Sequence, residues 1–468
     1  MINKSVRPVC VRWFSELSVA CRLSENVDAK NRKFKNDIGF PFTYHEEITL
    51  VIDHITYLGI GVGRVDVSKR HEALTHTEHG RNLSVSTETL ANWEVHVPTV
   101  IPGEKVIAKV FKNHKGYSQA DLISVVDSSL QRIQPACKYF AECSGCQYQM
   151  TSIEVQREWK RNQMQSILAN IGGIYIDVPN CLGTNVHYGY RTKLTPHFNV
   201  PRTHEELKVG FQKRGSKSII DIDRCIIATD SINEMYTTKR SNLKNDIKMS
   251  GLPKKGATLL FREGDNQRVE TDPRKLVLQT VSGVQFHYKA GEFFQNNQHA
   301  LPLLIENVLE ALIGDNCNVL VDVYCGTGLF ALSSHNHFKQ IYGIEISALA
   351  VEAAVMNAVG NNISNVSFMR GSSEKIFAAL TEETMAGKID PETTVVLLDP
   401  PRKGCDVQFL EQLVAFYPKK IVYVSCDPTT QARDAKYLVE NGYKVTNALC
   451  FDLFPNTRHI ESIITLRR

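Results

Sequence analysis

The C-terminal part of the chain alternates short apolar runs with segments of helical spacing. The runs, all after residue 300, are NVLVDVYC, QIYGIEI, VSFMRG, TVVLLDP and KIVYVSC. Runs that are apolar on both faces are typical of parallel strands covered by helices on both sides. We therefore predict a doubly wound, Rossmann-like α/β domain at residues 291–468.

The N-terminal part follows a different pattern, in which short strands are separated by turns. Its segments are EEITLVIDHITYLGIGVGRV, WEVHVPTVIPGEKVIAKVFK and YSQADLISVVD. Short strands at this spacing predict a small all-β barrel of the oligonucleotide-binding type at residues 45–128, which either binds nucleic acid or serves only for packing. Residues 129–290 are expected to form a mainly β central domain, with helices at IEVQREWKRNQMQSILANI and after Thr237.

Composition narrows the class of protein. The 468 residues exceed what one core usually serves, and no apolar run approaches the roughly 20 residues of a membrane-spanning helix. A net charge of +4 is compatible with a nucleic-acid partner without requiring one. Twelve cysteines in a chain of this length, with no secretory signal, do not suggest a disulfide scaffold and favour a reducing, intracellular compartment.

Residues 1–44 are interpreted as an N-terminal extension. The first 24 residues hold one acid, Glu16, against four basic residues: Lys4, Arg7, Arg12 and Arg22. This pattern fits an organellar transit peptide, which would place the protein in a mitochondrion or plastid. It fits equally well a frayed terminus of a cytoplasmic protein.

A glycine-bearing turn follows the first apolar run, in VLVDVYCGTGLFAL. Such a turn lets the backbone approach a ligand at the carboxyl end of a strand. Glu345 ends the second run, where a carboxylate can accept hydrogen bonds from ribose hydroxyls. The two features predict an adenosine-containing cofactor. Because neither a Walker lysine nor a complete Gly-x-Gly-x-x-Gly is present, S-adenosylmethionine is favoured over ATP and NAD.

Candidate chemistry stands at the ends of the later strands. LLDPPRKGCD places Asp399 and Arg402 on a stiff Asp-Pro-Pro-Arg corner, and VYVSCDP places Cys426 at the end of the next strand. A cysteine thiolate is a strong nucleophile, and its addition to carbon 6 of uracil would make carbon 5 nucleophilic. The adduct must then lose its carbon 5 proton. Glu461, in the final apolar run, is the candidate base if a hairpin or edge strand returns it to this crevice; otherwise it is a solvated strand residue.

These residues belong to motifs that resemble those of the S-adenosylmethionine-dependent RNA uracil-5-methyltransferases, which modify tRNA or large-subunit ribosomal RNA. The resemblance covers about residues 45–468 and rests on GEFFQNNQ, VDVYCGTGLF, GIEIS, LLDPPRKGC, YVSCDPTTQARD and FPNTRHIE. It implies that Cys426 attacks carbon 6 and that Glu461 removes the carbon 5 proton. It also implies cofactor contacts from Gln295, Tyr324, Glu345 and Asp399. Gln295 and Asp399 would lie close to the target base as well.

The N-terminal barrel similarly resembles the RNA-binding TRAM module of this family, through YLGIGVGRV and VPTVIPGEKVIAKV. Its candidate phosphate contacts, each of which could equally be a solvated charge, are Arg64, Lys105, Lys109, Lys112 and Lys115. An insertion, SKRHEALTHTEHGRN, lengthens the first hairpin region and leaves the register of the RNA contacts open.

Three clustered cysteines, Cys137, Cys143 and Cys146, could converge on one metal centre. We choose Cys225 over Cys181 as the fourth ligand. Four cysteines suit zinc or an iron–sulfur cluster equally well on chemical grounds. The resemblance favours a [4Fe-4S] cluster with a structural or RNA-positioning role, because the ribosomal RNA branch of the family carries one on this pattern.

We therefore expect a monomeric RNA methyltransferase, with no protein or membrane partner implied, that forms 5-methyluridine in a flipped-out uridine of tRNA or ribosomal RNA. Two alternatives stay open. One is an RNA-binding protein that has kept the fold without catalysis. The other is a methyltransferase acting on another atom, such as cytosine carbon 5 or an amino nitrogen.

Overall fold

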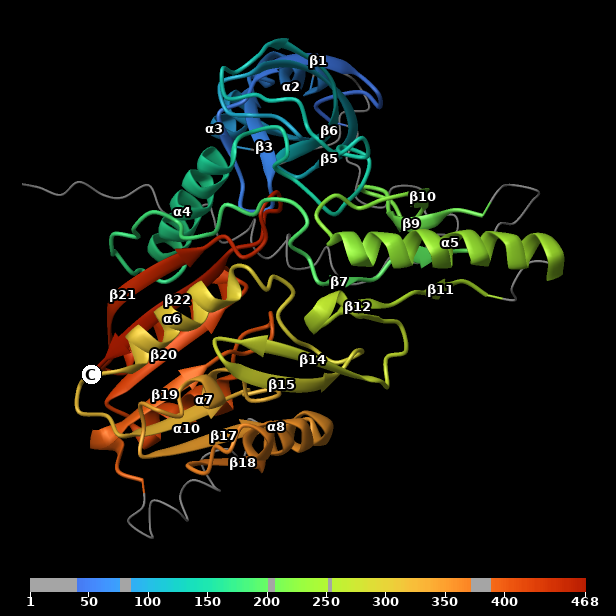
Figure 1. Cartoon of the computed structure of the whole chain (residues 1–468). Coiled ribbons are helices and arrows are strands. Elements are labelled where there is room, and N and C mark those ends of the chain that lie inside the picture. The colour runs from blue at the N-terminus through green and yellow to red at the C-terminus, as the bar shows by residue number, and fades with distance from the viewer. Residues whose placement is uncertain (1–39, 76–85, 201–206, 251–254, 372–388) are drawn as a thin grey trace, which may run out of the picture.

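The computed structural model describes residues 40–75, 86–200, 207–250, 255–371 and 389–468. A curved sheet near the N-terminus sits above a larger C-terminal sheet, and a region of short strands extends to one side (Figure 1). Among the helices in these ranges, none combines the length and apolar character needed to cross a bilayer. The candidate transit segment lies almost wholly within residues 1–39, outside the described residues.

The C-terminal sheet confirms the predicted α/β architecture. Its seven strands run in the order β18-β17-β16-β19-β20-β22-β21, with five parallel strands and an antiparallel pair at one side. The five apolar runs predicted as strands are all strands, because buried Val, Ile and Leu fit a sheet covered on both faces. The strands are β16 (Val319–Val323), β17 (Gln340–Glu345), β18 (Val366–Arg370), β19 (Thr394–Leu398), β20 (Lys420–Ser425), β21 (Lys444–Phe451) and β22 (Glu461–Arg467).

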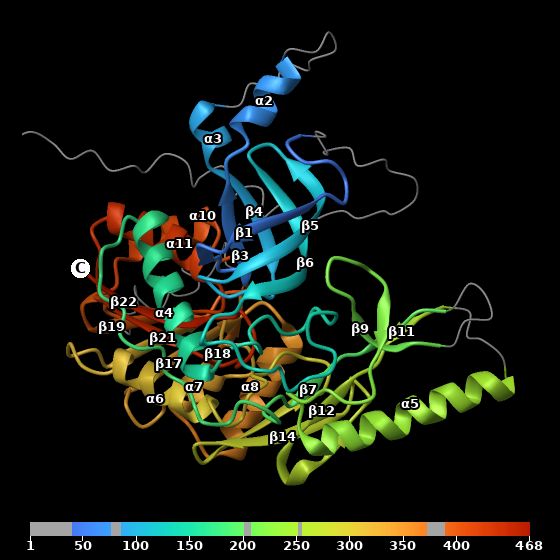
Figure 2. The ribbon, with the colours of Figure 1, turned by 90° about the horizontal axis from the view of Figure 1, so that it is seen from above.

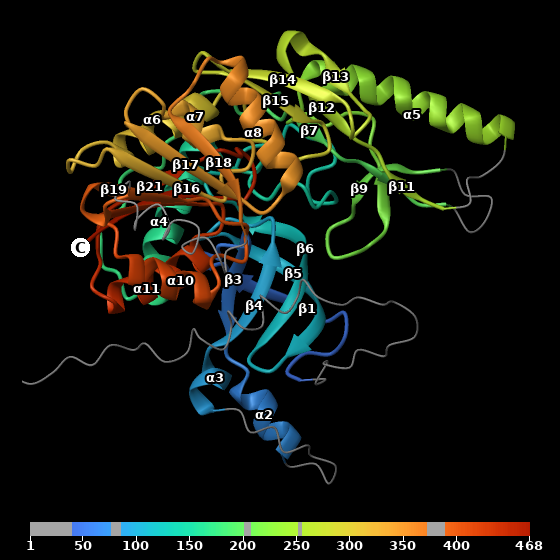
Figure 3. The same cartoon turned by 90° about the horizontal axis from the view of Figure 1, so that it is seen from below.

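Helices cover both faces of this sheet (Figure 3). One face packs against α4 (Ile153–Asn170), α10 (Val407–Phe416) and α11 (Pro428–Glu440). The other face packs against α6 (Leu301–Leu312), α7 (Leu329–Ser333) and α8 (Ala348–Gly360), together with the hairpin β14 (Leu276–Val281) and β15 (Val284–Lys289). Both α4 and the β14–β15 hairpin precede residue 291. The packed core therefore crosses the boundary predicted between residues 290 and 291.

The N-terminal sheet has six strands in the order β1-β5-β6-β4-β3-β2, and contacts between β1 and β3 show that it curls on itself. Trp93, fully buried, lies at its core and donates to the hydroxyl of Ser118 at 2.9 Å. Phe40 and Phe42, assigned to the extension, are buried in the same core. The strands are β1 (Glu47–Val51), β2 (His54–Ile55), β3 (Ile60–Val65), β4 (Trp93–Pro98), β5 (Lys105–His114) and β6 (Tyr117–Asp127).

The insertion after β3 begins with helix α2 (Ser68–Thr75), and α3 (Thr87–Ala91) follows the part of it that lies outside the described residues. The strands of residues 193–270, which follow the N-terminal sheet in the sequence, are short. They are β7 (Lys193–Leu194), β8 (His197–Phe198), β9 (Val209–Gln212), β10 (Ile219–Asp221), β11 (Ala257–Thr258), β12 (Phe261–Glu263) and β13 (Val269–Glu270). The expected polar helix is α5 (Asp230–Ser250), which projects away from the body of the protein (Figure 2).

Candidate active site

Cys426 and Glu461 meet at the carboxyl edge of the C-terminal sheet. The last paired residues of β20 and β22 are Ser425 and Ser462, so their chain neighbours Cys426 and Glu461 lie at the same end of this strand pair, and Glu461 is close enough to raise the pKa of the Cys426 thiol. Glu461 comes from a hairpin, as expected, but β22 lies between β20 and β21 and is not an edge strand. Asp427 caps α11 by accepting the Thr429 N–H at 3.0 Å, and this sharp strand-to-helix turn leaves Cys426 half-buried and open to a ligand.

Arg402 is the cation of this site. Its guanidinium is close enough to the Cys426 thiol to lower the pKa of that group, and it lies 3.4 Å from Nδ1 of His459. Together with Tyr57 and Arg458, these residues line one small cavity. Burial and the two neighbouring arginines lower the pKa of His459 to about 3. His459 is therefore a neutral hydrogen-bonding group at physiological pH and not the proton-accepting base.

The carboxyl groups of the site hold protons more tightly than usual. Burial, then the nearby Asp399, raises the pKa of Glu461 well above its ordinary range, and burial raises the pKa of Asp399 to about 7. Burial, then Glu461, raises the pKa of the Cys426 thiol to about 12, while Arg402 acts in the opposite direction. Ionisation of the thiol and of Glu461 thus depends on this guanidinium.

We expect Arg402→Met to slow the reaction of Cys426 at neutral pH. Both the thiol and Glu461 are active only without their protons, and their pKa values are raised, so the rate should increase as pH rises. Losing the guanidinium moves this increase to higher pH and costs about tenfold for each unit that the thiol pKa rises. The measurement is the pH dependence of Cys426 alkylation by iodoacetamide, followed by peptide mass spectrometry. Arg402→Lys should retain part of the effect, and an unchanged profile in Arg402→Met would contradict the assignment.

The turn after β16 is shaped to hold a nucleotide-like ligand. Tyr324, Gly326 and Gly328 all have positive φ, and a Cβ added at Gly328 would come within 2.9 Å of the Phe368 ring. Glu345 fixes this turn by accepting the Gly326 N–H at 3.1 Å. A carboxylate has lone pairs left over for ribose hydroxyls.

The remaining two cofactor candidates are Tyr324, within this turn, and Gln295. The ring of Tyr324 makes an edge-type contact with the ring of Phe409, with centroids 5.8 Å apart and an interplanar angle of 64°. Gln295 is buried in the loop between β15 and α6. That loop is tied to the segment before Glu461, because Asn297 donates to the Leu453 carbonyl at 2.8 Å.

Sequence reasoning missed Asp322, in the middle of β16. Its side chain is fully buried and accepts the Ala331 N–H at 2.9 Å, which ties the strand to α7 across the turn. Its other oxygen has no hydrogen-bond partner among the described residues, and burial raises its pKa well above the ordinary range. The available signal was an acid inside an otherwise apolar strand.

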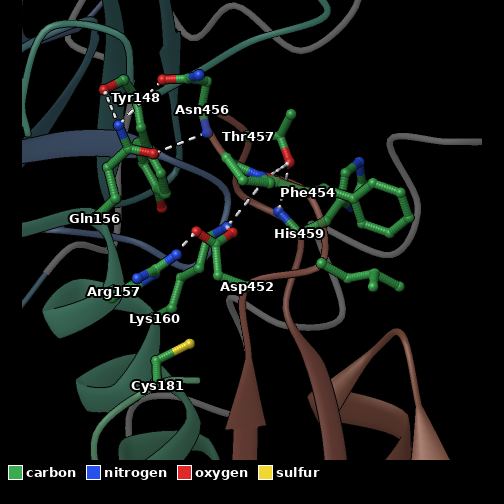
Figure 4. A network of polar contacts seen from close by, with 12 residues as sticks. Tyr148, Gln156, Arg157, Lys160, Cys181, Asp452, Phe454, Asn456, Thr457 and His459 are labelled. Carbon is green, nitrogen blue, oxygen red and sulfur yellow. Dashed lines mark hydrogen bonds and ion pairs between the residues drawn. The ribbon is translucent and has the colours of Figure 1, made fainter. Parts of the chain in front are cut away.

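A buried polar network holds the segment that leads into Glu461 (Figure 4). Lys160 of α4 and Asp452 are both fully buried, and their Nζ and Oδ1 atoms lie 2.5 Å apart. Gln156, also on α4, accepts the Asn456 N–H at 2.8 Å and donates to the Asn456 side chain at 3.2 Å. Helix α4 therefore fixes the position of the chain from which Arg458, His459 and Glu461 project.

Lys160→Met should destabilise the protein by about 3–5 kcal/mol, because it leaves the buried Asp452 carboxylate with only a longer contact, 3.5 Å to Nε of Arg157. The double variant Lys160→Met/Asp452→Asn should recover part of this loss. The free energies are compared by urea denaturation, with Lys436→Met on the exposed face of α11 as a control expected within about 0.5 kcal/mol of wild type. A loss below about 1 kcal/mol for Lys160→Met would contradict a strongly coupled pair.

The structure brings the four chosen cysteines into one region. Burial, and then the nearby Cys225, Cys143 and Cys137, raise the pKa of the Cys146 thiol to about 12. Cys181 lies elsewhere, with its sulfur 3.0 Å from that of Cys450. Within the described ranges, no group of three or more His, Cys, Asp or Glu residues is gathered so as to hold a metal ion.

The basic residues proposed for phosphate contact differ in their surroundings. Arg64 pairs with Asp53 at 3.0 Å, and Lys109 pairs with Glu47 at 3.1 Å. Lys105 and Lys115 are exposed and Lys112 is half-buried. Whether any of the five contacts RNA stays a prediction.

Comparisons with known proteins agree with this geometry. The sequence profile of the tRNA (Uracil-5-)-methyltransferase family matches residues 259–468. The chain is 35% identical to the tRNA (uracil(54)-C(5))-methyltransferase of Schizosaccharomyces pombe, with 92% of this chain and 79% of that protein covered. It is 34% identical to the Saccharomyces cerevisiae protein of the same name, with 86% and 73% covered.

A solved structure shares the fold. The crystal structure of Pyrococcus abyssi tRNA (uracil-54, C5)-methyltransferase in complex with S-adenosyl-L-homocysteine superposes with a TM-score of 0.64 at 21% sequence identity. It covers 90% of this chain and 100% of that one.

Proposed function

This chain belongs to the tRNA (uracil-5-)-methyltransferase family, and on that basis we propose that it methylates carbon 5 of uridine 54 in tRNA. The observation that carries the chemistry is the Cys426–Glu461 pair at the ends of β20 and β22, with Arg402 against the thiol. The two yeast relatives, both named for uridine 54, support tRNA over ribosomal RNA as the substrate.

In the proposed mechanism, the Cys426 thiolate forms a bond to carbon 6 of a flipped-out uracil. The electron pair of the carbon 5–carbon 6 double bond moves into the ring carbonyl, so carbon 5 becomes nucleophilic. S-adenosylmethionine supplies an electrophilic methyl group to that carbon. The Glu461 carboxylate then takes the carbon 5 proton, and the returning electrons expel the thiolate and restore the double bond. The thiolate leaves unchanged, and the proton ends on Glu461.

We propose Glu345, Tyr324, Gln295 and Asp399 as the residues that hold the methyl donor. The positive-φ turn, which Glu345 fixes through Gly326, supports this assignment, as does the unpartnered oxygen of Asp322 beneath the turn. Glu345 ends β17 and Asp399 follows β19, and these two strands flank β16, so both side chains stand at the same edge of the sheet.

We also propose that the curled N-terminal sheet is a TRAM-type barrel that binds the RNA backbone. The support is its six-strand composition and its basic residues on β5 and the following turn. RNA-binding sheets of this kind place cations along one face to contact phosphates.

The four cysteines are proposed to hold a [4Fe-4S] cluster. The support is their mutual proximity from two segments distant in sequence, around Cys146 and at Cys225. Three clustered cysteines with a distant fourth are the pattern that cluster-bearing members of the resembled family carry, which supports iron–sulfur over zinc.

Protein purified without oxygen should therefore contain iron and labile sulfide in equal amounts and absorb in the visible range. Cys146→Ser should lose most of both, because a missing thiolate opens the cluster to solvent. Cys181→Ser, which removes a cysteine outside this group, should retain them. Zinc in place of iron on metal analysis would contradict the cluster assignment.

The test of the function uses labelled S-adenosylmethionine with separate unmodified transcripts of tRNA and ribosomal RNA, digested to nucleosides. We expect 5-methyluridine from tRNA, and none from a tRNA that carries cytidine at position 54. Methylation of ribosomal RNA alone would overturn the substrate, and a product other than 5-methyluridine would overturn the reaction.

A further inference from the structure

A second pocket adjoins the catalytic cavity. It has a volume of about 450 Å³ and lies between the β2–β3 edge of the N-terminal sheet and helix α4. Tyr57 and Ile167 line both this pocket and the cavity of Cys426. A ligand that occupies the catalytic cavity therefore passes directly beside this second pocket.

The lining is aromatic and largely apolar. His54, Tyr57, His96 and Trp159 provide ring surfaces, and the residues described around the pocket include no lysine or arginine. Asp53 brings a carboxylate to the rim, paired with Arg64 at 3.0 Å. Burial lowers the pKa of His54, which keeps its ring uncharged at neutral pH. Such walls repel a phosphate and suit a flat, neutral ring, because bases stack on aromatic side chains.

An unused acceptor stands in the wall of this pocket. Gln163 is only 8% exposed, and its Nε2 donates to the Thr56 carbonyl at 3.1 Å and to the Tyr148 hydroxyl at 3.2 Å. Its Oε1 has no hydrogen-bond partner among the described residues. Buried acceptors are rarely left unpaired, so a ligand N–H that reaches this atom would satisfy it.

We propose that this pocket holds a second nucleobase of the substrate RNA, unstacked next to the target uridine and bearing an exocyclic amino group. The inference rests on the proposed function, since the RNA must first enter the catalytic cavity. The base stacks on Trp159 and donates its amino N–H to Gln163. The pocket would thereby help to select the nucleotide context of the target.

The test is a binding cycle with the full-length protein and an RNA hairpin that carries the target uridine. Each neighbouring nucleotide is replaced in turn by an abasic residue, and affinity is measured by fluorescence anisotropy. At one position, loss of the base should weaken binding to wild type about tenfold but leave binding to Trp159→Ala unchanged. Tyr175→Ala, which removes an aromatic residue that is 86% exposed and outside the pocket, should behave as wild type.

A substitution that fills the pocket gives a second test if Trp159→Ala fails to fold. Ser166 is exposed on α4 at the rim, so Ser166→Trp should be tolerated and should block the pocket, while Ser166→Ala should not. Ser166→Trp is expected to bind intact hairpin as weakly as wild type binds the abasic one. The proposal is overturned if no abasic position weakens binding to wild type while leaving binding to the pocket variants unchanged. It is also overturned if the variants weaken binding of every RNA equally. Either result is expected if the pocket holds a peptide or no ligand. The affinity measurement does not require methyl transfer. If the protein formed no 5-methyluridine but the base-specific loss of affinity were still seen, the proposed function would be contradicted and the pocket proposal would stand.

Discussion

Cys426→Ala is expected to reduce methylation by about 10⁴-fold or more, the scale of loss when a nucleophile is removed. The reason is chemical: without a bond to carbon 6, carbon 5 of uracil is too weak a nucleophile to take the methyl group. The measurement is methyl transfer under single-turnover conditions. RNA affinity should stay near that of wild type, because Cys426 is one of several residues that line the cavity and contributes one small side chain.

The control for this loss is a cysteine of similar exposure away from the site. Cys317, half-buried, precedes β16 at the opposite edge of the sheet, so Cys317→Ser should retain wild-type rates. If Cys426→Ala kept more than about a hundredth of the activity, covalent catalysis by this residue would be ruled out.

Glu461→Gln should trap the reaction halfway. The amide cannot accept the carbon 5 proton, whereas thiolate addition and methyl transfer do not need this carboxylate. We expect a covalent protein–RNA adduct that carries the methyl group and survives a denaturing gel, with product release reduced about 10²–10⁴-fold, the usual contribution of a general base.

Two variants make this result specific. The adduct should vanish in Glu461→Gln/Cys426→Ala, which lacks the attacking sulfur. Ser462→Ala, at the next position of β22, should form product without accumulating an adduct. Release of 5-methyluridine from Glu461→Gln at the wild-type rate would show that another group removes the proton.

The α/β sheet could be predicted because its strands are buried on both faces and read as unbroken apolar runs. The position of Cys426 followed from the same pattern, since it directly ends such a run. Glu461 was harder, because a Glu on a strand is usually solvated; the residues alone made it a candidate base, and the resemblance favoured that role. The structure supplies the physical reason, because Cys426 and Glu461 adjoin the paired Ser425 and Ser462 at the same end of β20 and β22.

Other features were beyond sequence reasoning because they depend on distant contacts. Lys160 and Asp452 are 292 residues apart, and the sequence around neither residue indicates a buried ion pair. The packing of α4 and of β14–β15 onto the C-terminal sheet is equally non-local, so the boundary drawn at a change of pattern does not follow the core. Arg402 was placed on a ligand-holding corner, but its effect on the pKa of the Cys426 thiol appears only in three dimensions.

The most direct measurement follows the carbon 5 hydrogen itself. Unmodified tRNA is transcribed with tritium at carbon 5 of every uracil and incubated with radiocarbon-labelled S-adenosylmethionine. We predict one tritium released to water for each methyl group incorporated by wild type, and no release by Cys426→Ala. Methyl incorporation without tritium release would place the methyl group on another atom and contradict this account.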